Sequence, residues 1–405
     1  MPDVSFGNLV IICAVAVAVP LLLGFNPRLR VPSVVVEIIA GVVLGPSVLD
    51  WVQVDLVVAV LSVLGLGFLL FLAGLEIDLH QLNRRLLTTS GLGYVITLAI
   101  AVPLGLGFQA AGWAGSGLLV AIALSATSLG LVVPVLKDAG SAETEVGTTV
   151  IAASTVADFA AVIALSLLFS ATGGTGSTIV LLSAVVLMAV AVTLAVMRLG
   201  RSMRLGGVLL RLQDTTAEIR VRLAVLVFVV FVALASRFGL ETILGAFLAG
   251  AVVSAVDRDT MSHPHLRTKL EAIGYGFLIP VFFVTSGIRL DLQGLVAEPS
   301  ALLRVPAFLA ALVLARGVPA LLYRRRLSRR STMAAALLQA TSLPFIVAAT
   351  QIGVELDRIS AVTATALVCA GLLSVLAFPA TALALLRGDA TSEEAEPAER
   401  AMASS

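Results

Sequence analysis

Residues 147–169 read GTTVIAASTVADFAAVIALSLLF, and this stretch decides how the rest of the chain is interpreted. It is long enough to cross a bilayer as a helix and carries one formal charge, Asp158. Asp158 follows Gly147 by roughly 16 Å of helix, which is near the middle of a hydrocarbon core about 30 Å thick. A carboxylate at that depth costs at least about 2.5 kcal/mol, so Asp158 is a candidate functional residue. The alternative is an aspartate that only hydrogen-bonds a neighbouring helix, a role that Ser or Asn fills at a smaller penalty.

The whole chain shares this apolar character. It is 59% hydrophobic and 13% charged, about half the charged fraction of a typical soluble domain. We therefore predict an all-α polytopic membrane protein. Nucleic acid is not an expected partner, because no segment carries a solvated basic face. Thirteen membrane-spanning helices are predicted near residues 6–24, 32–48, 56–75, 88–110, 115–136, 147–169, 178–197, 221–238, 240–256, 270–287, 301–322, 332–353 and 360–386.

Cysteine and histidine indicate no enzyme chemistry. Cys13 and Cys369 lie in apolar runs, as small hydrophobic residues do. The three histidines lie in predicted loops, where we expect them to be solvated rather than bound to a metal. No predicted span contains histidine, which argues against a membrane-embedded enzyme. We expect no cofactor and no resident metal.

The basic residues predict an orientation in the membrane. If the N-terminus is outside, only Arg237, Arg289, Arg304 and Arg358 fall on the outer side. Arg316 falls inside a predicted span, and all other Lys and Arg residues fall on the cytoplasmic side. This asymmetry follows the positive-inside rule and places the C-terminus in the cytoplasm. Residues 389–405 are polar and acidic, and we predict a disordered cytoplasmic tail.

Two halves of the chain repeat in order. Because the partner segments lie seven predicted helices apart, the second copy crosses the membrane in the opposite direction. This pattern predicts two inverted six-helix repeats, typical of secondary transporters, with the helix at 178–197 as the linker. The matching segments are EIIAGVVL (37–44) with ETILGAFL (241–248), GFL (67–69) with GFL (276–278), GLEIDL (74–79) with GIRLDL (287–292), and ATSL (126–129) with ATSL (340–343).

The ATSL segments lie in the middle of their predicted spans and precede Pro134 and Pro344. Proline removes a helical hydrogen bond, so two symmetry-related discontinuous helices are predicted. Freed carbonyls, hydroxyls and half-helix ends there can coordinate a cation. Ordinary helix packing through small and hydroxyl residues is the alternative. The candidate ligands are Thr127, Ser128, Thr341 and Ser342, with Ser154 one turn before Asp158.

Arg316 requires an acceptor if it is buried in the membrane, because its guanidinium stays charged. Asp158 and the carbonyl end of a broken helix are both candidate partners. The alternative is that Arg316 extends to the cytoplasmic interface, which its long side chain can reach.

The chain resembles the monovalent cation:proton antiporter superfamily, in particular its second branch, which includes Kef-type potassium efflux proteins and sodium/proton antiporters. The resemblance covers about residues 6–388. The residues that carry it are PSVVVEIIAGVVLGP (32–46), FLLFLAGLEID (68–78), LSATS (124–128), Ala157-Asp158 and FFVTSG (282–287).

The resemblance implies a membrane domain over 1–388 with two moving parts. Scaffold helices at about 6–75 and 221–287 would form a homodimer in the plasma membrane. Core helices at about 88–169 and 301–386 would slide against them, with the two discontinuous helices crossing beside Asp158. Asp158 matches the family's ion-binding position, and Arg316 matches a position where relatives carry Lys or Arg.

Departures from the family pattern affect stoichiometry and regulation. Ala157 replaces the Asp, Asn or Gln that relatives carry before the ion-binding aspartate, and Thr341-Ser342 replaces a common Gly-Glu pair. A nucleotide-binding gating domain, as in Kef-type proteins, is not expected in this chain. One titratable carboxylate beside an arginine predicts electroneutral 1:1 exchange of Na⁺ or K⁺ for a proton, by alternating access at Asp158. A sodium-coupled organic-anion symporter of related inverted-repeat fold is the alternative.

Overall fold

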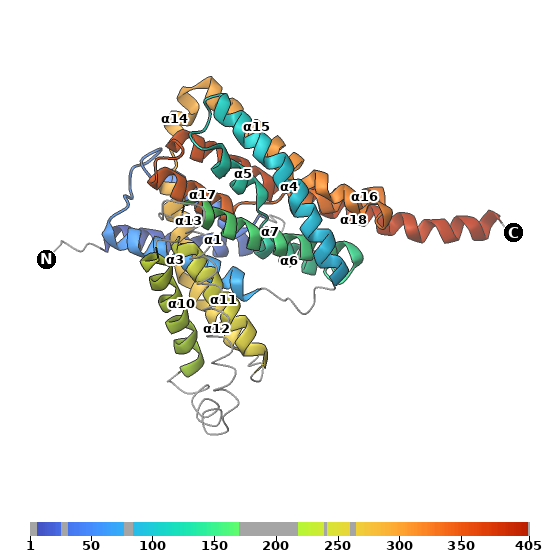
Figure 1. Cartoon of the computed structure of the whole chain (residues 1–405), viewed down its shortest axis with the longest axis horizontal. Coiled ribbons are helices and arrows are strands. Elements are labelled where there is room, and N and C mark those ends of the chain that lie inside the picture. Colours follow the sequence, from blue (N-terminus) through green and yellow to red (C-terminus); the bar gives the residue numbers. More distant parts are fainter. Residues whose placement is uncertain are drawn as a thin grey trace. The chain divides into compact units, whose positions relative to one another are not determined.

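The computed structural model describes residues 6–25, 31–76, 84–169, 218–238, 241–259 and 265–403. All of these residues form helices, turns or irregular segments, with no strand among them. Ten helical segments in this part are long and apolar enough to span a membrane, and Ser33–Leu44 and Thr242–Val256 are shorter apolar helices. Twelve of the thirteen predicted spans therefore coincide with helices (Figure 1). The predicted linker at 178–197 lies outside the described residues, so the count of thirteen stays a prediction.

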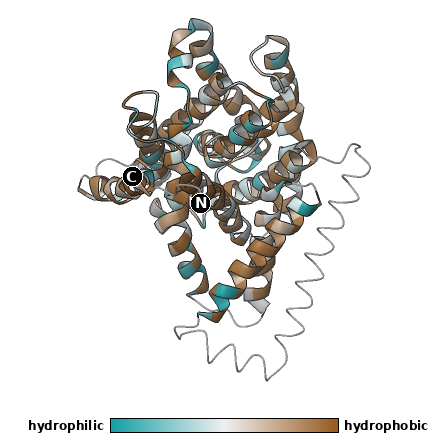
Figure 2. Ribbon diagram, turned by 90° about the vertical axis from the view of Figure 1, so that its left-hand side faces the viewer, coloured by the Kyte–Doolittle hydropathy of each residue, from teal (hydrophilic) through white to brown (hydrophobic). Residues whose placement is uncertain are grey.

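Most residues of these helices are hydrophobic, as the brown ribbon in Figure 2 shows. On the first helix, Val10 and Leu22 each expose 65% of their surface. A soluble protein would not expose such residues over whole helices, but lipid solvates them. The all-α polytopic membrane fold predicted from composition is confirmed.

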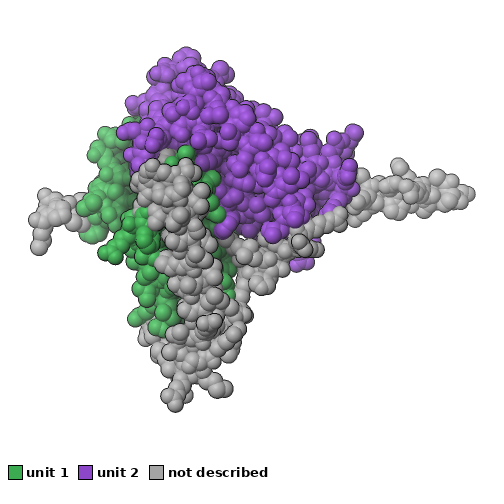
Figure 3. Space-filling view, viewed as in Figure 1, with its two compact units in different colours: residues 1–29, 36–79, 162–289 green, residues 30–35, 80–161, 290–405 purple. Residues whose placement is uncertain are grey.

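The chain divides into two compact units, coloured separately in Figure 3. The first comprises residues 1–29, 36–79 and 162–289, and the second 30–35, 80–161 and 290–405. The predicted sliding of a core against a scaffold concerns motion and stays a prediction. The helices that lie mainly in the first unit are α1 (Gly7–Phe25), α2 (Ser33–Leu44), α3 (Leu56–Leu75), α10 (Ile219–Arg237), α11 (Thr242–Asp259), α12 (Leu266–Ile273), the π-helix η1 (Gly274–Leu278) and α13 (Ile279–Ile288).

Close approach of α3 and α11 organises the first unit. A Cβ atom on Gly74 of α3 would collide with the carbonyl oxygen of Phe247, and one on Gly250 of α11 would collide with that of Phe71. Two glycines in reciprocal contact let the helix backbones touch, which is how membrane helices gain packing energy without a hydrophobic driving force.

The second unit contains the predicted site. Its helices are α4 (Arg84–Ala110), α5 (Gly117–Ser125), α6 (Leu129–Asp138), α7 (Glu145–Phe169, whose residues up to Ala161 belong here), α14 (Leu292–Ala297), α15 (Pro299–Leu312), the π-helix η2 (Val313–Gly317), the 3₁₀-helix η3 (Val318–Arg325), α16 (Arg329–Gln339), α17 (Pro344–Glu355) and α18 (Ala361–Ala403). Within this unit, α16 packs against α18 and η3, and α4 packs against α5.

Two features of the second unit differ from the sequence prediction. Pro134 was predicted to interrupt its helix but lies inside α6, well past the break at 126–128. Pro344 occupies the first turn of α17, a position that tolerates proline because the N–H groups there lack helical partners. The tail predicted to be disordered over 389–405 continues α18 as helix through Ala403, in keeping with its many Ala and Glu residues, which favour helix.

Candidate functional site

The first helix break lies between α5 and α6. Ala126 ends α5 in an extended conformation, with φ −80° and ψ 158°, so the chain leaves the helix there. Ser128 precedes α6 with φ −108° and ψ 89° and makes no side-chain capping bond. The N–H groups of this break and of the first turn of α6 are therefore available to another acceptor.

That acceptor is the carboxylate of Asp158 on α7. The backbone N–H of Thr127 donates to Asp158 Oδ1 at 3.1 Å, and that of Leu129 donates to Oδ2 at 3.2 Å. Both oxygens thus lie at the N-terminal end of α6, where the helix dipole and free N–H groups stabilise negative charge. An isolated carboxylate would be very costly at this depth, and these two bonds make an ionised Asp158 tolerable.

The second break, between α16 and α17, contacts the first. The N–H of Ser128 donates to the carbonyl oxygen of Thr341 at 3.0 Å, which joins the two breaks by a backbone hydrogen bond. Behind them, Ser374 of α18 accepts from the N–H of Ser342 and donates to its carbonyl, both at 3.2 Å. The two predicted discontinuities are therefore present, and they meet where Asp158 is bound. The inverted repeat that suggested them stays a prediction.

Arg316 lies in the π-helix η2 and is 1% exposed. A π-turn widens the backbone and often marks a functional site. The guanidinium donates to the hydroxyl of Thr127 from both Nε (2.8 Å) and Nη2. Nη1 donates to the hydroxyl of Thr97 at 3.3 Å, and Nε also reaches the carbonyl oxygen of Gln339 at 3.4 Å. The side chain therefore does not extend to the interface, and of its two predicted partners it contacts the carbonyl end of a broken helix.

Thr127 connects Arg316 to Asp158. Its N–H binds the carboxylate, and its hydroxyl accepts from the guanidinium and donates to Gln339 O at 2.8 Å. Gln339 is the last residue of α16, so its carbonyl lies at the negative end of that half-helix. The positive and negative groups of the site are each stabilised by a half-helix end of the appropriate sign.

Two other predicted ligands have polar atoms available. Ser154 and Ser342 are fully buried, and neither hydroxyl oxygen has a hydrogen-bond partner among the described residues. Thr341 instead directs its hydroxyl to Leu337 O at 3.0 Å. Of the predicted set, the structure links Asp158, Thr127 and Arg316 through hydrogen bonds and joins Ser128 to Thr341 through the backbone.

Sequence reasoning missed three residues of the site. Thr97 and Gln339 accept hydrogen bonds from Arg316, and Tyr94 lies close enough to interact electrostatically with both Arg316 and Asp158. Tyr94 also shares a hydrogen bond of 3.1 Å with Ser125. Of these three residues, Gln339 could have been found from the sequence, because it is a polar side chain inside an apolar run and directly precedes the second ATSL segment.

Known proteins resemble this chain over most of its length. The model of the family described as "Sodium/hydrogen exchanger, transmembrane" matches residues 13–387. The chain is 31% identical to the "Putative Na(+)/H(+) antiporter YjbQ" of Bacillus subtilis, over 94% of this chain but only 63% of that protein. It is 30% identical to the "Na(+)/H(+)-K(+) antiporter GerN" of Bacillus cereus, over 66% of this chain and 68% of that protein.

The fold is similar to a solved structure as well. The sodium proton antiporter MjNhaP1 of Methanocaldococcus jannaschii superposes with a TM-score of 0.60, covering 94% of this chain and 95% of that one. At 17% identity, this likeness concerns the fold alone.

Proposed function

This chain belongs to the sodium/hydrogen exchanger transmembrane family, and from that premise we propose that it is a secondary transporter that exchanges a monovalent cation, Na⁺ or K⁺, for a proton. The observation that carries the proposal is Asp158. Its two oxygens accept backbone N–H bonds at the N-terminus of α6, where the two broken helices meet. A carboxylate held in this way can bind either a proton or a cation.

The cation site is proposed to include hydroxyl oxygens near Asp158. Ser154 is one helical turn before it on α7, and its buried oxygen has no partner among the described residues. Ser342 offers a second such oxygen from the other break. Hard monovalent cations prefer oxygen ligands, and a buried hydroxyl without a hydrogen bond gains most from supplying one. The relatives' names include both sodium and potassium, so the choice of cation is open between these two.

We propose electroneutral 1:1 exchange. Ala157 adds no second carboxylate, and Arg316 keeps its charge whichever ion is bound. The loaded site then carries the same charge with a proton as with a monovalent cation. In this proposal the second unit moves against the first and exposes Asp158 to each side in turn. The transporter is a homodimer in the plasma membrane, with its N-terminus outside and its C-terminus in the cytoplasm.

Exchange is tested in proteoliposomes that carry a pH-sensitive dye. Addition of Na⁺ or K⁺ is expected to move protons across the wild-type membrane, and Asp158→Asn is expected to abolish that movement. Asp291→Asn is the matched control, since Asp291 lies in the same unit but caps α14 through a bond to Gly294 N at 2.7 Å. Retained exchange in Asp158→Asn would contradict the proposal. A transport current on a planar membrane would contradict the 1:1 stoichiometry alone.

A further inference from the structure

Five exposed arginines gather at the turn between η3 and α16, and the exchange mechanism uses none of them. Two segments long and apolar enough to span a membrane meet at this turn, one ending at Arg325 and the other beginning at Arg329. The turn therefore lies where the chain leaves the membrane and enters it again. The five residues, here called the arginine cluster, are Arg324, Arg325, Arg326, Arg329 and Arg330.

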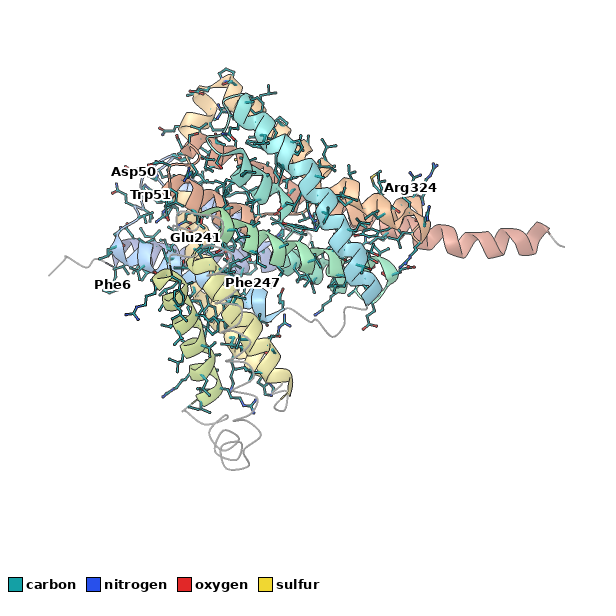
Figure 4. The ribbon with its side chains drawn as sticks, viewed as in Figure 1. Phe6, Asp50, Trp51, Glu241, Phe247 and Arg324 are labelled. Atoms are coloured by element: carbon teal, nitrogen blue, oxygen red, sulfur yellow. The ribbon has the colours of Figure 1, made fainter. Side chains whose placement is uncertain are left out.

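Exposed apolar side chains flank the arginine cluster on both helices. Leu321 of η3 exposes 54% of its surface, and Met333 of α16 exposes 57%. Each lies about one helical turn from an arginine of the cluster, so lipid tails that cover Leu321 and Met333 end beside the guanidinium groups. Arginine extends its charged end from apolar surface toward the headgroup layer, and Figure 4 shows Arg324 pointing away from the ribbon.

Acidic side chains of the described residues do not pair with most of this cluster. Arg324, Arg325, Arg326 and Arg329 make no side-chain hydrogen bond or ion pair with another described residue. Four arginines at one turn repel one another, so a mobile or bound anion is needed to offset their charge.

The basic residues near the start of α12, in the first unit, differ in this respect. Lys269 forms an ion pair with Glu218 at 2.8 Å, and Arg267 forms one with Glu271 at 2.7 Å. Acidic side chains of the chain itself therefore neutralise these two positive charges, whereas the arginine cluster requires an anion from outside the described part of the chain.

We propose that the arginine cluster binds the phosphate groups of anionic membrane lipids. A guanidinium binds phosphate through two parallel N–H···O bonds. Clusters of about 4–8 basic residues directly beside a spanning helix are typical of anionic-lipid binding. A lipid also covers Leu321 and Met333 with its acyl chains while its phosphate meets the arginines, which a free anion in water does not do. The site lies in the second unit and does not depend on the proposed exchange function.

Titration of the full chain with phosphatidylglycerol in detergent, followed by native mass spectrometry, tests the site. The wild type is expected to bind phosphatidylglycerol at least several-fold more tightly than phosphatidylcholine, which has no net charge. Arg325→Gln/Arg326→Gln is expected to weaken phosphatidylglycerol binding about thirtyfold, since each basic residue near an anionic surface contributes about a factor of five. Equal affinity of the wild type for the two lipids, or unchanged affinity in the variant, would overturn the proposal.

Arg267→Gln/Lys269→Gln is the matched control, because it removes the same number of positive charges from residues that have acidic partners. It is expected to bind phosphatidylglycerol like the wild type, and an equal loss in both double variants would overturn the proposal. Excess inorganic phosphate is expected to leave the lipid bound, whereas its displacement would overturn the assignment of a lipid. If Arg325→Gln/Arg326→Gln fails to fold, Arg324→Gln/Arg329→Gln removes two other unpaired charges of the same cluster, with the same expected result.

Discussion

Replacing Thr127 by Val separates its two contacts. The backbone N–H remains and still binds Asp158, while the hydroxyl that accepts from Arg316 and donates to Gln339 O is lost. Nη2 of Arg316 then has no acceptor among the described residues, whereas Nε retains Gln339 O at 3.4 Å. A hydrogen bond to a charged group contributes about 1.5–3 kcal/mol and a neutral one about 1 kcal/mol, so the expected loss is about 2.5–4 kcal/mol.

Two assays test this prediction. Thermal unfolding in detergent is monitored by size-exclusion chromatography, and proton exchange is measured in proteoliposomes. Thr127→Val is expected to lower the apparent Tm by several degrees and to slow exchange, because Arg316 is no longer held at the break beside Asp158. Thr127→Ser keeps the hydroxyl and is expected to behave like the wild type in both measurements. Equal behaviour of the Val and Ser variants would refute the idea that this hydroxyl binds Arg316.

Three further predictions concern other parts of the structure. Gly250→Ala forces a Cβ against the Phe71 carbonyl and is expected to destabilise the protein by about 1–3 kcal/mol in thermal unfolding. Gly91→Ala is the control and should leave stability unchanged, because nothing lies within 4 Å of the added Cβ. Equal effects of Gly250→Ala and Gly91→Ala would contradict the close approach of α3 and α11. Pro134→Ala is expected to leave exchange in proteoliposomes near wild type because Pro134 lies inside α6; loss of exchange would mean that this proline does create the break. Asp55→Ala removes the hydrogen bond from Val58 N (2.9 Å) that caps α3. The free energy of unfolding, measured by chemical denaturation, should fall by about 1 kcal/mol, and the KM for Na⁺ should not change. A changed KM would argue against a purely structural role for Asp55.

The membrane fold could be predicted from the sequence, and the assignment of Asp158 and Arg316 to a transport site stays a prediction. Asp158 and Arg316 were identifiable because a charge inside an apolar span is costly, and each such span contains very few polar groups. The two breaks were identifiable because the ATSL segment recurs in order. The error at Pro134 arose because proline was taken as the cause of the break, whereas the backbone leaves the helix at Ala126.

The hydrogen-bond partners could not be predicted from the sequence, because they join segments far apart in the chain. Arg316 meets Thr97 and Thr127 across 219 and 189 residues, respectively. Hydroxyl residues are common in these spans and usually bond to their own helix, as Thr350 does with Ile346 O at 2.7 Å. Nothing in a single sequence distinguishes the few that face a charge from the many that do not.

The position of Arg316 bears on how exchange can be electroneutral. Figure 4 labels Arg324, one of several exposed arginines near the end of η3, which water and lipid headgroups can solvate. Arg316, eight residues earlier, has hydroxyls and a carbonyl as acceptors instead. These partners are neutral, and Thr127 lies between Arg316 and Asp158. A direct ion pair would have to be broken each time a cation bound. Because Thr127 mediates the contact, Asp158 can exchange its proton for a cation while the arginine and its partners stay in place. In the proposed 1:1 exchange, one carboxylate and one arginine then fix the charge of the loaded site in both transport states.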